Sequence, residues 1–202
     1  MYEVEIKVPA ALGTVRERLI AAGATRNDVI RQRDVYYDAP HRAFAETDEA
    51  LRIRHETTLA AEGTGSNGDN RWDGGDDGAL TDDDTSTAIT YKGPLVEAAS
   101  KTREEFETGV SDPEAAAGIL GGLGFEPAAT VEKRRERWTL DDATVTLDDV
   151  ADVGEFIEVE LTAVDAAGIE DARERAIAAL DRLGLDADDQ LRTSYLELLL
   201  AE

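Results

Sequence analysis

The chain has 202 residues, and 45 acidic side chains against 21 lysines and arginines give a formal net charge of −24. This balance argues against nonspecific binding to nucleic acids or anionic membranes, because both are polyanions. Cysteine is absent, which excludes disulfides and thiolate metal sites, and no apolar run reaches the roughly 18 residues of a membrane helix, so we expect a cytoplasmic protein without a membrane or nucleic-acid partner.

The first segment, residues 1–9, alternates polar and apolar side chains. Two carboxylates and an ammonium, Glu3, Glu5 and Lys7, share one face, opposite valine and isoleucine. A period of two is typical of a β-strand, whose side chains point to opposite faces. The ionic row fits two structures: the solvated outer face of a half-buried sheet, or a polar interior that binds a metal and a phosphate.

The rest of the chain mixes strands and helices. Gly23 can end the first helix, and Asp112-Pro113 supplies an N-cap and first turn for the next. Turns are predicted at Asp141-Asp142 and at 152–154. The predicted elements are helices at 11–22, 113–122, 166–183 and 192–201, and strands at 28–38, 50–57, 88–93, 101–109, 129–140, 143–150 and 155–162.

Residues 59–87 differ from this pattern. They are rich in glycine and aspartate, with eight acids and one base, a net charge of −7. The acids could bind calcium, but their spacing does not match the ligand pattern of a 12-residue calcium loop. We therefore predict a disordered, acidic loop insertion within a single domain that spans residues 1–202.

Nearly every predicted strand has one apolar face and one ionic face of mixed sign. A solvated sheet could show this, but three of the four lysines lie on the ionic faces, and helical segments are present to cover the apolar faces. If helices pack outside, the ionic faces point into a closed barrel. The expected lining is seven acids and seven bases: Glu3, Glu5, Glu105, Glu107, Asp148, Glu158 and Glu160, with Lys7, Arg52, Arg54, Lys92, Arg103, Lys133 and Arg135.

These residue types suit a triphosphate and a divalent metal. Arginine binds phosphate oxygens in pairs and lysine binds them as a point charge. Mg²⁺ and Mn²⁺ prefer carboxylate and phosphate oxygens. Buried charges in this number need partners, and a polyphosphate with divalent cations would complete the balance.

The set of motifs resembles the CYTH superfamily, the triphosphate tunnel metalloenzymes. The family's ExExK signature is matched by Glu3, Glu5 and Lys7. The further matches, in family order, are LRIR (Arg52, Arg54), TYKGP (Lys92), TREEFE (Arg103, Glu105, Glu107), EKRRERW (Lys133, Arg135), LDDV (Asp148) and GEFIEVE (Glu158, Glu160). The stretch VYYDAPHRAFAETDEALRIR and the ending TSYLELLL are most similar to the class IV adenylyl cyclase-like branch.

The resemblance implies an α+β fold, a closed eight-stranded antiparallel β-barrel, or tunnel, with helices packed outside, and Mg²⁺ or Mn²⁺ as cofactor. It implies metal ligands among the acids (Glu3, Glu5, Glu107, Asp148, Glu158, Glu160), triphosphate contacts from all seven bases, and catalytic roles for Lys7 and Glu105. The substrate would be a nucleoside triphosphate or inorganic triphosphate.

Three activities remain open at this point: cyclisation of ATP to cyclic AMP and pyrophosphate, hydrolysis of inorganic or thiamine triphosphate, and non-catalytic binding of a polyphosphate or nucleotide. A homodimer is also left open. Neither His41 nor His55 is expected to act as a base, since His55 alternates onto the apolar face and His41 lies in a predicted turn.

Overall fold

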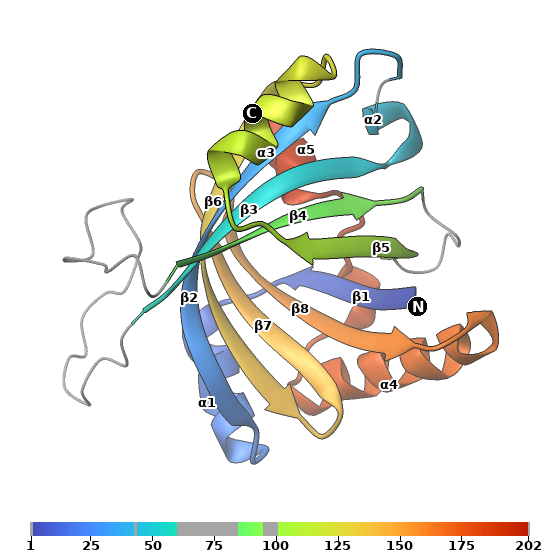
Figure 1. Cartoon of the computed structure of the whole chain (residues 1–202). Helices are drawn as coiled ribbons and strands as arrows, with labels where there is room; N and C mark the ends of the chain where they lie inside the picture. The colour runs from blue at the N-terminus through green and yellow to red at the C-terminus, as the bar shows by residue number, and fades with distance from the viewer. Residues whose placement is uncertain (1, 43, 60–84, 95–100, 202) are drawn as a thin grey trace.

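The computed structural model describes residues 2–42, 44–59, 85–94 and 101–201. Within them, eight strands close into an antiparallel barrel in the spatial order β1-β5-β4-β3-β2-β6-β7-β8 (Figure 1). The strands are β1 (Tyr2–Pro9), β2 (Thr25–Asp38), β3 (Ala50–Thr58), β4 (Thr85–Lys92), β5 (Lys101–Gly109), β6 (Glu126–Leu140), β7 (Ala143–Val150) and β8 (Gly154–Ala163). The α+β class and the closed eight-stranded barrel with external helices, both predicted, are confirmed.

Helices cover the outside of the barrel. They are α1 (Leu12–Ala21), α2 (Phe44–Thr47), α3 (Pro113–Gly122), α4 (Ile169–Arg182) and α5 (Tyr195–Leu200), with 3-10 turns at Ala166–Gly168 and Ala187–Asp189. The main core lies between α1, α4 and the apolar faces of β1, β7 and β8. A second cluster joins α2 and α3 to β2 and β3. No helix among the described residues has the length and apolar composition to cross a bilayer.

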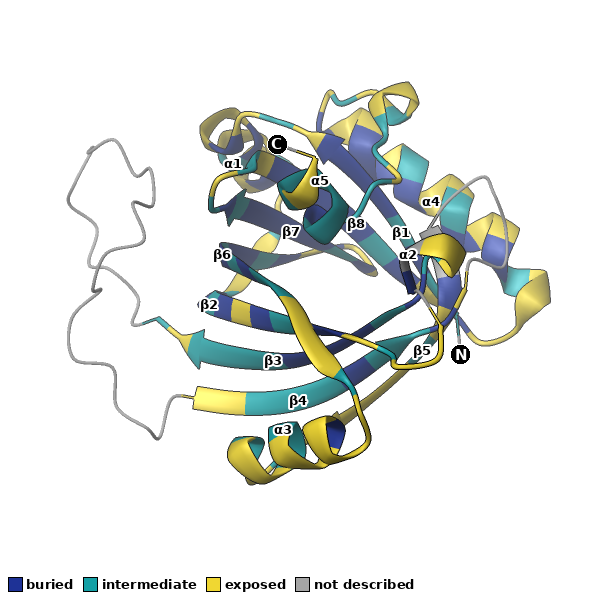
Figure 2. Cartoon of the chain, turned by 90° about the horizontal axis from the view of Figure 1, so that it is seen from above, coloured by how far each residue is buried: buried dark blue, intermediate teal, exposed yellow. Residues whose placement is uncertain are grey.

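The helix predicted at 192–201 does not only cover the outside of the barrel. Helix α5 lies over one end of the barrel (Figure 2), and its first residue, Tyr195, packs with Phe156, Val150 and Tyr36. A capping box holds this start: the Ser194 hydroxyl accepts a hydrogen bond from the backbone N–H of Glu197, and the Glu197 carboxylate accepts one from the Ser194 N–H. The end of the chain therefore contributes side chains to the barrel interior as well as to its outside.

The residues predicted to form turns and helix ends lie in those positions in the structure. Asp141 (φ 55°) and Asp152 (φ 60°) adopt the left-handed conformation in the two predicted hairpin turns, which aspartate tolerates better than most residues. The Asp112 carboxylate caps α3 by accepting a hydrogen bond from the Ala115 N–H. Gly23 (φ 79°) follows the end of α1, as predicted.

The boundaries of some strands differ from the prediction. Strands β2 and β6 each begin three residues early, at Thr25 and Glu126. Residues 85–87 were expected in the insertion but belong to β4, because Thr85 pairs with Thr57 and extends the hairpin with β3. The remainder of the predicted insertion, residues 60–84, lies outside the described residues.

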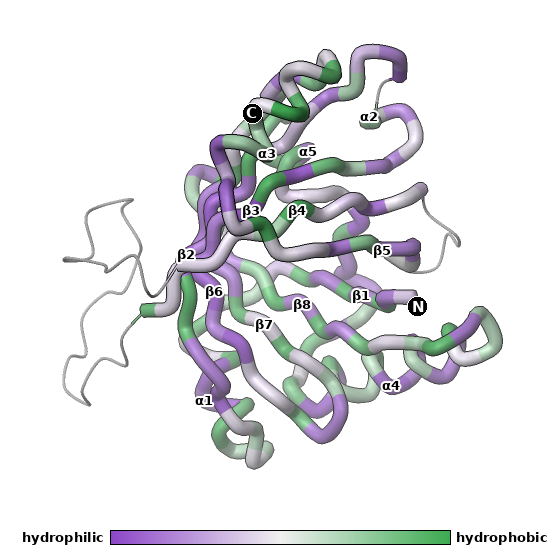
Figure 3. Tube along the Cα trace, viewed as in Figure 1, coloured by the Kyte–Doolittle hydropathy of each residue, from purple (hydrophilic) through white to green (hydrophobic). Residues whose placement is uncertain are grey.

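The packing of the apolar faces fixes which way the ionic faces point. On β1, Val4, Ile6 and Val8 are at most 2% exposed beneath α1 and α4. Burying each such side chain is worth about 1.5–3 kcal/mol, and a register slip of one residue would expose all of them. The alternation is visible along the strands in Figure 3. The ionic rows are therefore held inside the barrel.

Candidate active site

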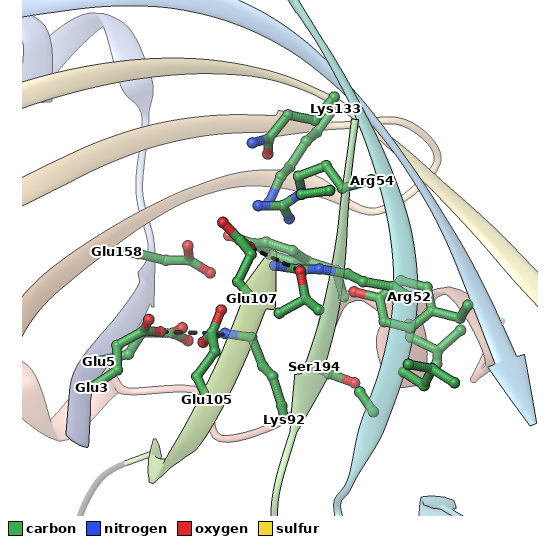
Figure 4. A pocket seen from close by; sticks show the side chains of 18 of the residues that line it. Glu3, Glu5, Arg52, Arg54, Lys92, Glu105, Glu107, Lys133, Glu158 and Ser194 are labelled. Carbon is green, nitrogen blue, oxygen red and sulfur yellow. Dashed lines mark hydrogen bonds and ion pairs between the residues drawn. The ribbon is translucent and has the colours of Figure 1, made fainter. Parts of the chain in front are cut away.

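The inward rows surround one cavity of about 650 Å³ (Figure 4). Thirteen of the fourteen predicted lining residues border it: Glu3, Glu5, Lys7, Arg52, Arg54, Lys92, Arg103, Glu105, Glu107, Lys133, Arg135, Glu158 and Glu160. The exception is Asp148, which is fully buried behind them. The alternative of a solvated outer face is wrong, because Lys7 and Lys133 are only 3% exposed.

Three carboxylates gather on one side of the cavity. Oxygens of Glu3, Glu5 and Glu160, from β1 and β8, all lie within 4.8 Å of one another. We call these three residues the carboxylate cluster. Burial, followed by repulsion from neighbouring carboxylates, raises the pKa of Glu160 to about 8, although Arg135 opposes the shift, and also raises that of Glu5. Three hard oxygen donors at this spacing fit a divalent cation, which would remove the repulsion.

Two predicted metal ligands are instead engaged by arginine. The Arg135 guanidinium donates to both oxygens of Asp148 (2.6 and 2.5 Å) and to Glu158. Burial alone would raise the pKa of Glu158, but Arg135 and then Lys133 hold it well below its usual range. Glu158 still borders the cavity, whereas Asp148 acts on the cavity only through Arg135 and through Lys133, 3.3 Å away. Their predicted role as metal ligands stays a prediction.

On the opposite wall, Asp34 of β2 pairs with two arginines of β3. Arg54 binds both of its carboxylate oxygens, at 2.6 and 2.7 Å, and Arg52 lies 3.4 Å away. We call Asp34, Arg52 and Arg54 the Asp34 ion-pair group. Burial favours neutral Asp34, but Arg54 and Arg52 outweigh it and lower its pKa far below the ordinary value. The Arg52 Nε is buried and finds no hydrogen-bond partner among the described residues, so a donor remains for a bound anion.

Lys92, the last residue of β4, lies between two carboxylates of the cavity lining. The Lys92 ammonium lies 3.2 Å from Glu3 and 2.7 Å from Glu105. Burial would lower its pKa, but Glu3 raises it well above the ordinary value, so it stays charged. Glu107 is exposed at the β4–β5 side and accepts a hydrogen bond from the Thr90 hydroxyl at 2.8 Å.

Arg103 lies at the end of the cavity near α2. Its guanidinium donates to the backbone carbonyl of Asp48 at 2.6 Å and lies 3.4 Å from that residue's carboxylate. Asp48 has a left-handed backbone (φ 53°), which this contact supports. The predicted phosphate ligand Arg103 therefore also holds the loop between β2 and β3 against the cavity.

Lys7 and Lys133 meet the C-terminal segment. Lys7 donates to the backbone carbonyl of Thr193 at 2.6 Å, and its Nζ lies 4.2 Å from the centre of the Tyr195 ring. The Lys133 Nζ lies 4.9 Å from the same ring. Burial and then Arg135 lower the pKa of Lys133 to about 8.

A comparison with protein families identifies this arrangement. The family model for the CYTH domain matches residues 1–195. The chain belongs to the CYTH family.

Individual CYTH relatives cover almost the whole chain. The "Putative adenylate cyclase" of Methanocaldococcus jannaschii is 34% identical over 199 residues, 98% of each chain. Human thiamine-triphosphatase is 27% identical over 198 residues, which are 94% of this chain and 80% of the human protein. A solved structure from Pyrococcus horikoshii shares 32% identity and a TM-score of 0.81, with 98% of each chain covered. Both relatives carry the names of enzymes, and enzymes of the CYTH tunnel type depend on divalent metals.

Sequence reasoning missed three residues that shape this CYTH site: Asp34, Thr90 and Tyr195. Asp34 alternates with Gln32 and Tyr36 on the inward face of β2, and Thr90 stands two residues before Lys92, so the period-two signal could have found both. Tyr195 gave no such signal, because its inward position depends on where α5 crosses the barrel. Neither histidine is among the described residues that line the cavity; the Nδ1 of His55 lies 3.1 Å from the hydroxyl of Thr87.

Proposed function

We propose that this CYTH protein converts ATP to cyclic AMP and pyrophosphate with the aid of Mg²⁺ or Mn²⁺. One observation carries the proposal: a cluster of like-charged carboxylates and a set of buried cations border the same cavity. The first fits a divalent cation and the second fits a triphosphate. The volume of about 650 Å³ is in the range of pockets for drug-sized ligands, so it has room for a nucleoside besides the phosphates.

Each side chain has a role in this proposal. Glu3, Glu5 and Glu160 hold the metal, which when bound neutralises charge on the phosphate oxygens. Lys7, Lys92 and Lys133, with Arg52, hold the triphosphate, as do the remaining arginines of the lining. Glu107, Glu158 and Asp148 support this arrangement as ligands or through Arg135.

The reaction forms a bond from the 3′-oxygen to the α-phosphorus and breaks the bond from that phosphorus to the pyrophosphate oxygen. The hydroxyl proton must leave the nucleophile. Burial would raise the pKa of Glu105, but Lys92 lowers it, so its carboxylate is ionised and can accept this proton. The cations stabilise the charge that develops on the leaving pyrophosphate, and Lys7 is the member of this set with the predicted catalytic role.

Hydrolysis of a triphosphate is the second candidate. The match to human thiamine-triphosphatase favours it, since that relative is named for hydrolysis of an organic triphosphate. In this reaction water attacks the terminal phosphorus, and the same carboxylates and cations would be used. The two candidates differ in the phosphorus attacked, so their products distinguish them.

Product analysis tests the proposal directly. Purified protein is incubated with ATP, tripolyphosphate or thiamine triphosphate and Mn²⁺, and products are separated by ion-exchange chromatography. We expect cyclic AMP and pyrophosphate from ATP. Orthophosphate together with ADP, pyrophosphate or thiamine diphosphate from the respective substrates, without cyclic AMP, would favour the second candidate, and no turnover of any of them would overturn both. Glu105→Gln should abolish turnover, whereas Glu104→Gln, on the exposed outer face of the same strand, should not change it.

A further inference from the structure

We infer that Tyr195 is a positioning residue whose ring holds the ammonium groups of Lys7 and Lys133 in the cavity. Lys133 is also paired with Asp148, 3.3 Å away, whereas the ring holds Lys7 without neutralising its charge. The inference rests on the proposed binding of a triphosphate in this cavity. It concerns the C-terminal helix, which the sequence placed on the outside of the barrel.

The geometry is that of one aromatic ring shared by two cations. The Nζ atoms of Lys7 and Lys133 lie 4.2 and 4.9 Å from the ring centre, both within the range of about 6 Å in which a ring face attracts an ammonium. All three residues are nearly buried, with exposures of 3%, 3% and 6%. Such contacts are stronger in sites from which water is removed.

The ring itself is held from several sides. It packs against the Phe156 ring at a centre-to-centre distance of 5.2 Å. The capping box of Ser194 and Glu197 fixes the backbone at the start of α5. The Leu191 N–H donates to the Lys7 carbonyl at 2.7 Å, which ties the C-terminal segment to β1.

An aromatic partner differs from a carboxylate in one respect that matters here. A carboxylate cancels the charge of the ammonium it holds, whereas a ring attracts the cation through its quadrupole and carries no net charge. No carboxylate within salt-bridge distance of the Lys7 ammonium is found in the described part of the chain, where its contacts are the Thr193 carbonyl and this ring. The full charge of Lys7 therefore remains for a polyanion, in a cavity whose other cations are largely paired with acids.

The hydroxyl is not the active part of this contact. It is buried near Glu158, but no group of the described residues accepts a hydrogen bond from it with good geometry. Replacement by phenylalanine should therefore preserve the function of the ring, and replacement by leucine should remove it.

The test measures tripolyphosphate binding to the full-length protein by titration calorimetry, in EDTA and at fixed salt. We expect Tyr195→Leu to raise the Kd about tenfold, or roughly 1.4 kcal/mol, and Tyr195→Phe to stay within about threefold of the wild type. Phe156→Leu is the matched control: it removes the adjacent buried ring, over which neither lysine ammonium is found in the described structure, and should lower the Tm without changing the Kd.

A shape-conserving variant covers the case in which Tyr195→Leu does not fold. Trifluorophenylalanine at position 195 keeps the ring but weakens its quadrupole, and it should raise the Kd above that of Tyr195→Phe. An unchanged or lower Kd in the leucine or fluorinated variant would overturn the inference. Equal losses of tripolyphosphate affinity in Tyr195→Phe and Tyr195→Leu would also overturn it, and so would equal losses of affinity in Phe156→Leu and Tyr195→Leu. A wild type that binds no tripolyphosphate would overturn the proposed function itself, and the role of Tyr195 with it.

Discussion

The two walls of the cavity handle buried charge in opposite ways. In the Asp34 ion-pair group, one carboxylate is matched by two guanidiniums, and both of its oxygens are bonded to Arg54. In the carboxylate cluster, Glu3, Glu5 and Glu160 face one another, and the pKa of Glu160 rises to about 8. The carboxylate of the first wall is fully paired by the chain itself. On the second wall Lys92 pairs with Glu3 and Arg135 lies 3.7 Å from Glu160, but three carboxylates still face one another, and a bound cation would relieve their repulsion.

This difference separates structural charge from functional charge. Removing one partner of a well-formed buried ion pair lowers the free energy of unfolding strongly, because the other charge is left buried without compensation. A cluster of like charges is instead held together by the rest of the fold at a cost to stability. Binding of a counter-ion to the cluster stabilises the folded protein. Removal of Asp34 from the first wall should therefore change mainly stability, whereas mutations in the carboxylate cluster should change mainly activity and metal binding.

Asp34→Asn should give the largest effect. It leaves two buried guanidiniums without their carboxylate, and we expect a loss of about 3–5 kcal/mol in the free energy of unfolding. Chemical denaturation measures this loss. The matched control is Asp28→Asn on the same strand, where Arg137 makes the same two-bond contact at 2.7 and 2.8 Å but both side chains are about one-third exposed. There we expect less than about 1 kcal/mol, and equal losses at the two sites would contradict the comparison.

Glu3→Gln should leave the fold intact and lower turnover by at least about 100-fold, as expected for loss of a metal ligand or charge stabiliser. The fold should survive because Lys92 keeps its 2.7 Å pair with Glu105. Steady-state kinetics with Mn²⁺, together with the Tm, measure both parts. Full activity of this variant, or of the wild type in excess EDTA, would show that the carboxylate cluster does not hold a required metal.

The raised pKa of Glu160 gives metal binding a pH dependence. Mn²⁺ binds the ionised carboxyl, so below about pH 8 binding must release a proton. The apparent Kd should fall by up to about tenfold per pH unit as the pH rises toward 8, and then level off. Calorimetry in buffers of different ionisation enthalpy measures the released proton. Glu160→Gln should reduce this dependence to the part that comes from the raised pKa of Glu5, and a pH-independent Kd in the wild type would contradict the assignment.

The raised pKa of Glu160 also predicts how the stability of the metal-free protein changes with pH. The folded-state pKa of Glu160 lies above its ordinary value of 4.5, so its protonated form contributes stability that is complete below about pH 4.5. That contribution is lost as the pH rises through about 8. Saturating Mn²⁺ should restore it, since the cation replaces the proton as partner of the carboxylate cluster.

Alternation along the strands predicted most of the lining, and the resemblance to the CYTH superfamily implied the closed eight-stranded barrel. A period of two indicates which side chains share a face, and if helices cover the apolar faces, the ionic rows point inward. It does not state which charges pair across strands. Asp34 and Arg54 meet because β2 and β3 are paired with those two residues in register, which the sequence of neither strand specifies. Asp148 has the period of a lining residue but is buried behind Arg135.

The position of α5 also depends on the tertiary structure. The run YLELLL has the composition of an external helix, and the prediction placed it there. Its first turn instead reaches the interior because the backbone of residues 191–193 is bound to Lys7. Contacts of this kind join residues more than 180 positions apart, and local pattern carries no information about them.

The predicted insertion should give the smallest effect, and it tests whether the charge balance of the cavity is independent of the charge of the rest of the chain. Residues 60–84 carry eight acids and one base, a net −7 of the total of −24. Strands β3 and β4 remain paired up to Thr57 and Thr85, so a short Gly/Ser turn can join them. With this replacement we expect the specific activity to stay within a few-fold, since none of the fourteen predicted lining residues lies in this segment. Loss of activity with an unchanged Tm would show that these residues act on the cavity. The charge balance of the cavity would then depend on more than its two walls.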